Sequence, residues 1–214
     1  MKEAMNIVWL KRDLRLQDHL PFFEAENNSK YNYLPIYILE PSAMAYPDSS
    51  LRHLQFVYHS VLEMNKVLSA FNRKVHILYG EALEVFTFLS ENFEIKNVYS
   101  YQESGVKATW ERDNAVSELL KENRIKWTQF QRDGIIRGIK NRVNWDKNWY
   151  IAVNSPLILN GYSQNEGAVK SFPFDLPEPL EKSLQKYPEL FQKPGERYAL
   201  RYMRSFCESR GVNY

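Results

Sequence analysis

Cysteine is almost missing from this chain of 214 residues, since Cys207 is the only one. A single thiol excludes an internal disulfide and a cysteine-based metal cluster, and such sparse use of cysteine is typical of a reducing compartment. The four histidines are scattered, and His53 and His59 fall on different faces of one predicted helix. We therefore expect a cytoplasmic protein with no metal site.

A long apolar run is missing as well. The first apolar run, residues 7–10, is far too short for a signal peptide, and charged residues follow it at once. No stretch approaches the roughly 18 to 20 apolar residues that cross a bilayer. We therefore expect no membrane among the partners of this protein.

Glycine is sparse, with eight residues, and the glycine-rich motifs of several enzyme classes are absent. The chain has no G-x-G-x-x-G after its first strand, no P-loop G-x-x-x-x-G-K-[ST] and no G-x-S-x-G nucleophile elbow. The net charge is only +2, so the totals do not indicate a nucleic-acid-binding protein. A local basic patch can still lie within a nearly neutral chain.

What the first 131 residues do contain is a regular alternation of strand and helix patterns. Five short runs rich in β-branched or aromatic residues predict strands, and residues with helical spacing separate them. The predicted strands are Ile7–Leu10, Tyr33–Leu39, Val75–Tyr79, Asn97–Tyr101 and Lys126–Gln131. This order predicts an α/β fold, a Rossmann-like five-stranded mainly parallel sheet with helices on both faces.

The helix boundaries follow from capping residues. The longest helical pattern covers residues 49–71, and Ser49 or Ser50 can cap its start. We expect the first helix to begin with Asp18 as its N-cap and Pro21 in its first turn.

The chain changes character after Arg132. Six of its ten prolines fall between Pro156 and Pro194, which predicts a long proline-rich connector over residues 133–194. A terminal helix is expected within residues 195–214, with an apolar stripe that has no obvious partner in the sequence. The stripe consists of Ala199, Leu200, Met203 and Phe206.

The segment VWLKRDLRLQDH, residues 8–19, turns abruptly from apolar to charged. The turn leaves the carboxyl end of the first strand, and ligands of parallel α/β sheets lie beyond the carboxyl ends of the strands. A structural interpretation gives Asp18 a capping role and pairs Arg15 with Asp13. We expect Lys11 and Arg12 to be more exposed, either solvated or facing a ligand anion.

This segment resembles the N-terminal signature of the photolyase/cryptochrome family, in which an apolar strand ends in a basic pair followed by D-L-R-L-x-D. Further resemblances follow in the same order. They are YLPIYILEP for the second strand, SSLRHLQFVYHSVLEMNKVL for the long second helix, VHILYGEALEVFTFL for the third strand and its helix, WERDNAV for the R-D pair of the fourth helix, and GERYALRYMRSFCESRGVNY for the opening of the helical second domain.

The resemblance implies a function and assigns different roles to two domains. Residues 1–132 would be the antenna domain of a light-driven deoxyribodipyrimidine photolyase, and residues 195–214 would begin the helical domain that holds flavin adenine dinucleotide (FAD). In a photolyase, excited reduced flavin gives an electron to a pyrimidine dimer flipped out of damaged DNA. The 214-residue chain alone would be inactive, and its partners would be the FAD domain and, through the whole protein, damaged DNA. A signalling cryptochrome shares every motif, and a stand-alone nucleotide-binding α/β module is a third hypothesis.

The resemblance also implies an antenna site. Family pockets draw on the turn after the first strand, the end of the second strand and the start of the second helix, with Glu103 after the fourth strand as a weaker wall. Arg52 suits a carboxylate or phosphate, although a solvated first-turn arginine is an equal alternative. The implied site residues are Leu10, Lys11, Arg12, Leu39, Glu40, Arg52 and Glu103.

The nature of the antenna group is restricted by one departure from the family pattern. Folate-binding members carry an Asn-Glu pair where this chain has Ala108 and Thr109. A flavin or a deazaflavin therefore fits the sequence better than a folate, and an empty site is the alternative. We expect the neighbouring Trp110 to be a core residue rather than a stacking platform.

Residues 132–149 form a basic segment with interleaved tryptophans. Such a composition can bind DNA phosphates, although it is more often a surface on which domains pack. The candidate DNA-binding residues are Arg137, Lys140 and Arg142.

Overall fold

The computed structural model describes residues 2–28, 30–132, 134–135, 140–167 and 170–213. Five parallel strands form a single sheet in the order β3-β2-β1-β4-β5. The strands are β1 Ala4–Leu10, β2 Tyr33–Leu39, β3 His76–Tyr79, β4 Glu94–Tyr101 and β5 Lys126–Phe130. The predicted α/β fold is therefore confirmed, and each predicted strand is found within a few residues of its expected bounds.

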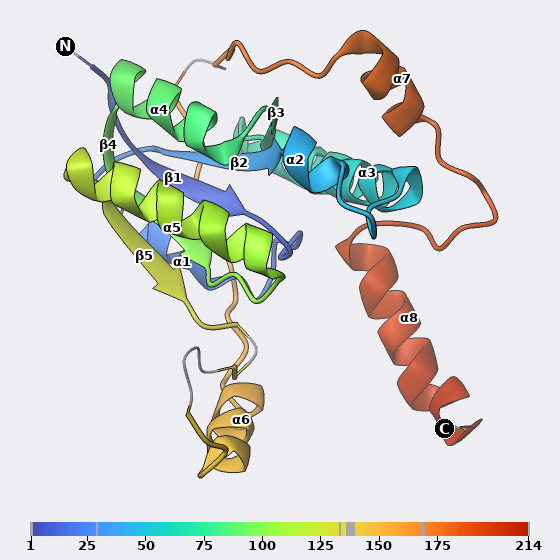
Figure 1. Ribbon diagram of the computed structural model, residues 1–214. Helices are drawn as coiled ribbons and strands as arrows, with labels where there is room; N and C mark the ends of the chain where they lie inside the picture. The colour runs from blue at the N-terminus through green and yellow to red at the C-terminus, as the bar shows by residue number, and fades with distance from the viewer. Residues whose placement is uncertain (1, 29, 133, 136–139, 168–169, 214) are drawn as a thin grey trace.

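Helices cover both faces of the sheet (Figure 1). The helices of the two layers are α1 Leu20–Asn27, α3 Leu51–Leu68, α4 Ala82–Asn92 and α5 Lys107–Glu122. One core cluster packs Trp9 of β1 against Phe86 of α4 and Leu120 of α5. The cluster on the other face packs Val8 against Phe22 of α1 and Val61 of α3.

The capping predictions for α1 and α3 had different outcomes. Ser50 caps α3 as predicted, because its hydroxyl accepts a hydrogen bond from the His53 N–H. The prediction for α1 is wrong by one residue, since His19 is the N-cap and its ring accepts from the Phe22 N–H. Asp18 lies in the left-handed region with a φ of 53°, and its carboxylate accepts from the Ile158 N–H instead.

The described part of residues 133–194 contains two helices, α6 Trp145–Val153 and α7 Glu178–Gln185, and no strand. Much of this segment lies on the α/β core. The Tyr79 N–H donates to the Phe174 carbonyl at 2.8 Å, and Phe172 and Leu184 are buried. The Gln55 side chain on α3 donates to the Ser183 carbonyl at 2.9 Å, which fixes α7 against α3.

Three short elements complete the chain: α2 Pro41–Met44, η1 Ser69–Phe71 and, after α8 Glu196–Glu208, η2 Arg210–Asn213. α6 and α8 project away from the sheet (Figure 1). Within the described residues, none of the helices combines the length and the apolar character that a membrane span requires. Those same residues include no cluster of three or more histidine, cysteine or carboxylate side chains suited to a metal ion.

Candidate functional site at the carboxyl edge of the sheet

The order of the strands reverses beside β1, because β2 and β3 extend the sheet on one side and β4 and β5 on the other. Such a switch point is where open α/β sheets bind ligands. Lys11 and Arg12 follow β1, Glu40 follows β2, and Glu103 follows β4. The turns after three adjacent strands of the sheet therefore bring charged side chains to one place.

Arg112 on α5 connects these turns. Its guanidinium contacts Glu40 at 2.5 Å, Glu103 at 3.0 Å and Asp113 at 2.9 Å. The two cations of the β1 turn complete the set, since Lys11 pairs with Asp113 at 2.8 Å and Arg12 with Glu103 at 2.9 Å. We call these six residues the carboxyl-edge cluster: Lys11, Arg12, Glu40, Glu103, Arg112 and Asp113.

Burial and pairing compete within this cluster. Burial raises the pKa of Glu40 and outweighs the opposing effect of Arg112. Burial would also raise the pKa of Glu103, but the hydrogen bond and charge of Arg12, together with Arg112, lower it overall. Arg112 is buried at a cost to its charged form, yet the carboxylates, with Glu40 first, raise its pKa. The cluster is held together by mutual neutralisation of three cations and three carboxylates.

The prediction that Lys11 is exposed is wrong. Its side chain is only 6% exposed, and its ammonium lies 4.4 Å from the ring centroid of Trp9 and 5.1 Å from that of Trp127. Burial lowers the pKa of Lys11, with Asp113 opposing the change. The tryptophan faces and the carboxylate together hold this cation inside the protein.

Arg12 is the exposed member of the carboxyl-edge cluster, with 54% of its side chain accessible. Only its Nε donates to Glu103, and its outer guanidinium nitrogens have no hydrogen bond to any residue that the structure describes. Gly105 leaves room for this pair. A Cβ there would lie 2.6 Å from an Arg12 nitrogen and 2.7 Å from a Glu103 oxygen.

The rest of the signature segment stabilises the turn itself. The Asp13 carboxylate accepts from His19 Nε2 at 2.6 Å and from the Lys11 N–H at 3.0 Å. The expected Arg15–Asp13 pair is not formed, because Arg15 donates to the Asp18 carbonyl instead. Burial raises the pKa of Asp13, but the hydrogen bond from His19 and the other donors lower it overall.

The same segment also joins distant parts of the chain. The backbone N–H groups of Leu16 and Gln17 donate to the Glu196 carboxylate at 2.8 and 3.1 Å, which fixes the first turn of α8. The His19 N–H donates to the Asn160 side chain, whose amide donates back to the His19 carbonyl. Each of these anchors lies more than 130 residues away along the chain.

Comparison with known proteins bears on the family and on the fold. A sequence model of the family described as DNA photolyase matches residues 6–138, which is more than half of the chain. The chain belongs to the DNA photolyase family. A search of curated protein sequences found no match.

Solved structures of photolyases and cryptochromes share the fold. Over 93% of this chain, the archaeal photolyase from Sulfolobus tokodaii superposes with a TM-score of 0.67 at 18% identity. The Synechocystis sp. PCC6803 cryptochrome reaches 0.75 at 14% identity over 97%, and a class III photolyase from Agrobacterium tumefaciens 0.68 at 19% over 96%. The chain spans 45–47% of the length of these structures. It corresponds to the N-terminal domain of the photolyase/cryptochrome family.

The remaining residues of the photolyase-type site prediction occupy two kinds of environment. Leu10 and Leu39 are buried in two different core clusters, and Tyr37 packs against both clusters. Arg52 lies in the first turn of α3, outside the carboxyl-edge cluster, with its guanidinium 4.4 Å from the ring centroid of Phe191. The structure thus brings Lys11, Arg12, Glu40 and Glu103 together and leaves Arg52 apart from them.

The predictions for the tryptophan and for the basic segment also differ in outcome. Trp110 was expected in the core but is 40% exposed, because it lies on the outward side of α5. Lys140 and Arg142 are exposed and precede α6. Arg137 lies outside the described residues.

Sequence reasoning missed Arg112 and Asp113 as members of the carboxyl-edge cluster, and it missed His19 as the partner of Asp13. The R-D pair on α5 of this photolyase family chain was recognised as a motif, but its position opposite the β1 turn depends on how the helix packs. One signal was available, since a charged pair at the centre of an amphipathic helix needs partners if that face is buried. His19 gave no comparable signal, because a single histidine in a charged turn is usually solvated.

Proposed function

We propose that this chain is the N-terminal domain of a light-driven DNA photolyase and that its carboxyl edge positions an antenna chromophore. The observation that carries the proposal is the placement of Arg12. It is a half-exposed cation at the switch point of the sheet, and it is the only member of the carboxyl-edge cluster with most of its side chain in solvent.

The residues of this edge fit the anionic part of a flavin. The outer nitrogens of Arg12 can donate to a phosphate or an ionised ring, and Glu103 orients the guanidinium by accepting a hydrogen bond from its Nε. A bound flavin or deazaflavin would supply absorption of near-UV and blue light. The Sulfolobus tokodaii photolyase is described as holding two FAD molecules, with a novel light-harvesting cofactor implied, which supports a flavin over a folate here.

The exposed apolar side chains of α8 support a partner domain. Leu200, Met203 and Phe206 are all exposed, while Glu196 ties the start of the same helix to the signature segment. An apolar helical face in water is typical of a protein interface. A helical FAD-binding domain, as in the longer relatives, is the partner we propose for this face, and catalysis by excited flavin would belong to that domain.

DNA contact is a further part of the proposal. Lys140 and Arg142 are exposed next to α6, where Trp145 and Trp149 stack with ring centroids 6.4 Å apart. Phosphate contacts by these cations, and by Arg137, would make DNA binding of the whole protein weaken with salt. Replacing Lys140 and Arg142 by glutamine should then make the salt dependence less steep. The magnitude of the negative slope of log affinity against log salt should fall by roughly two.

A signalling cryptochrome is the second candidate. It is favoured by the Synechocystis cryptochrome, whose fold has a TM-score of 0.75 with this chain. Both candidates share the α/β domain, so the antenna test below applies to either. Repair of pyrimidine dimers by the complete protein in light would decide for the photolyase.

The test is an absorption and fluorescence titration of the purified chain with FAD, flavin mononucleotide and a deazaflavin. We expect one of them to bind with a shifted band, and Arg12→Ala to weaken binding about tenfold or more, since a charged hydrogen bond is lost. Lys107→Ala is the matched control, because Lys107 is an exposed cation on α5 outside the cluster. No shifted band with any of the three, or equal binding by Arg12→Ala, would refute the antenna role.

A further inference from the structure

A second cavity lies at the opposite, amino edge of the sheet. β3 begins opposite Ile36, so that Tyr33, Leu34 and Pro35 of β2 extend past its first residue. The resulting notch holds a cavity of about 350 Å³, which is within the usual range of small-molecule sites. We call it the amino-edge pocket.

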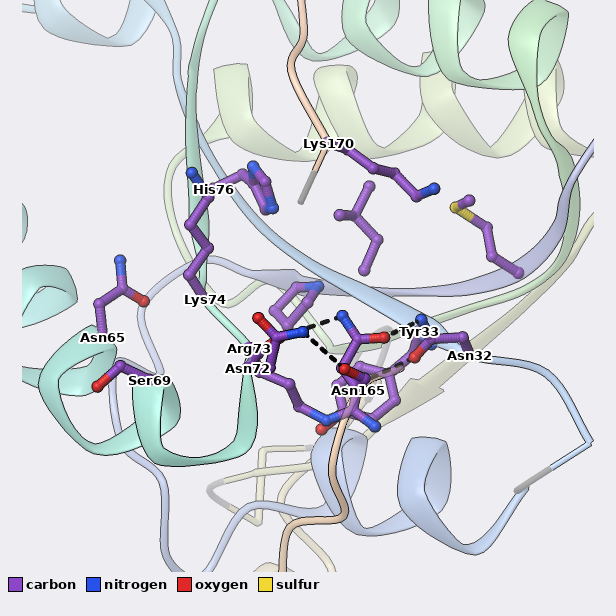
Figure 2. A pocket seen from close by; sticks show the side chains of 13 residues that line it. Asn32, Tyr33, Asn65, Ser69, Asn72, Arg73, Lys74, His76, Asn165 and Lys170 are labelled. Carbon is purple, nitrogen blue, oxygen red and sulfur yellow. Dashed lines mark hydrogen bonds between the residues drawn. The ribbon is translucent and has the colours of Figure 1, made fainter. Parts of the chain in front are cut away.

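The floor of the amino-edge pocket is apolar. Met5, Leu34 and Pro35 line it, and the His76 ring, in edge contact with Phe172 at 5.1 Å, stands beside them. Figure 2 shows His76 and Lys170 on one side of the cavity and the side chains of Asn32, Asn72 and Asn165 on the other. The site therefore offers an apolar surface between two polar walls.

One polar wall is already saturated. The Asn72 side chain donates to the Asn165 carbonyl at 2.7 Å, and the Asn165 side chain donates back to the Asn72 carbonyl at 3.2 Å. Asn32 donates to the Asn165 side chain, and each guanidinium nitrogen of Arg73 donates to Asn32 or Ser163. These bonds hold the segment after α6 against the sheet. The polar side chains of this wall therefore already have hydrogen-bond partners within the protein.

The other wall is cationic and incompletely paired. Lys74 has no ion-pair or hydrogen-bond partner among the described residues, and its side chain is exposed at the pocket. Lys170 pairs with Glu3 at 2.5 Å. Burial, followed by the charges of Lys74 and Lys170, lowers the pKa of His76 to about 4. Both lysines therefore act on the same ring, which is neutral near pH 7.

We propose that the amino-edge pocket is a binding site for a small organic anion, a phosphate or carboxylate carried on an apolar or aromatic body. The anionic group would lie between Lys74 and Lys170, with the neutral His76 as a hydrogen-bond donor, and the body would cover Met5, Leu34 and Pro35. The site is independent of the antenna proposal, because it uses the other end of the strands and shares no residue with the carboxyl-edge cluster.

The test uses three probes, adenosine monophosphate, phenyl phosphate and benzoate, each against the purified chain with ¹⁵N-labelled histidine. Binding is followed by calorimetry and by the His76 ring signals in an NMR spectrum. We expect at least one probe to bind and shift the His76 signals, and the double variant Lys74→Gln/Lys170→Gln to weaken it about tenfold. Ser69→Trp, which places a large side chain at an exposed position of the pocket rim, should block binding.

Three controls make the result decisive. Lys121→Gln removes an exposed cation on α5 and should change nothing. Arg12→Ala should also leave probe binding intact, so failure here and failure of the antenna proposal can be told apart. Adenosine and inorganic phosphate should each bind more weakly than adenosine monophosphate if that nucleotide binds. The proposal is overturned if no probe moves the His76 signals, if the lysine variants bind as well as the parent chain, or if inorganic phosphate binds as tightly as the organic anions.

Discussion

The two edges of the sheet use charge in opposite ways. At the carboxyl edge, three cations meet three carboxylates, and all but Arg12 are largely buried. At the amino edge, Lys74 has no carboxylate partner among the described residues, and the neighbouring His76 is held neutral. The difference shows that most of a charged motif can be buried in structural ion pairs, whereas a lysine outside any motif can be exposed without such a pair in the part of the chain that the structure describes.

The largest effect is expected from breaking the carboxyl-edge cluster at its centre. Arg112→Met would leave Glu40, Glu103 and Asp113 buried without their shared cation, and we expect a loss of about 3–5 kcal/mol in the free energy of unfolding. Urea denaturation measures it. Lys107→Met, on the exposed side of the same helix, should cost no more than about 0.5 kcal/mol. Equal, small losses in both variants would mean that the ion pairs of Arg112 do not stabilise the fold.

The amino edge should show its charge balance as a pH dependence. The folded pKa of His76, about 4, lies below the ordinary 6.5, so the unfolded chain takes up the proton first. The stability due to neutral His76 is complete above about pH 6.5, declines on acidification and is lost by about pH 4, a change of about 3 kcal/mol. Unfolding curves between pH 7 and pH 4 measure it.

The control for this pH effect is His76→Gln, which cannot titrate. Its stability should fall less than that of the parent chain over the same interval, because only the other groups contribute. An NMR titration of the His76 ring locates the pKa directly. A midpoint near 6.5 in the folded protein would contradict the expected burial and the influence of the two lysines.

A smaller effect should follow from crowding the exposed member of the carboxyl-edge cluster. A Cβ at position 105 would approach the Arg12–Glu103 pair to 2.6–2.7 Å, and we expect Gly105→Ala to cost about 1 kcal/mol as the pair is displaced. Gly161→Ala is the matched change, because nothing lies within 4 Å of its Cβ. Thermal melting of both variants checks this, and a Gly105→Ala protein as stable as Gly161→Ala would mean that the pair moves freely.

The smallest effect is expected for Lys74→Gln alone. Since this lysine has no partner among the described residues, its removal should change stability by less than about 0.5 kcal/mol. Denaturation in urea at pH 7 is sufficient to measure this. A substantial loss would show that Lys74 supports the fold, and the contrast between the two edges would then be wrong.

Much of the fold could be predicted because its signals are local. The β2 bounds Tyr33–Leu39 match the predicted strand, because a run of seven apolar or aromatic residues is a local signal of a buried strand. Ser49 and Ser50 were both candidate caps of α3, and Ser50 is the cap; such a signal is local because a capping serine needs only its own backbone neighbours. The α1 cap was missed because Asp18 bonds to Ile158, a partner remote in the chain that no local pattern reveals.

The candidate site was only partly predictable for the same reason. Lys11, Arg12, Glu40 and Glu103 were expected in one site because the resemblance to the photolyase/cryptochrome family implied it, and the turn after β1 was expected at the ligand-binding edge of the sheet. Their ion pairs could not be predicted, because they depend on Arg112, which the packing of α5 brings into contact with Glu40 and Glu103. The amino-edge pocket had no sequence signal at all, because it results from the late start of β3 and from the return of residues 165–170 to the sheet.

By itself, the sequence determined the alternation of strands and helices, the family and the set of charged residues after β1, because these depend on neighbours along the chain. The tertiary structure alone decided that Lys11 is buried against Trp9, that Arg12 is the accessible member of its cluster, and that Lys74 lies beside a cavity with no partner among the described residues. The physical reason is that exposure and charge pairing are set by side chains from distant segments, which come together only when the sheet and its helices pack.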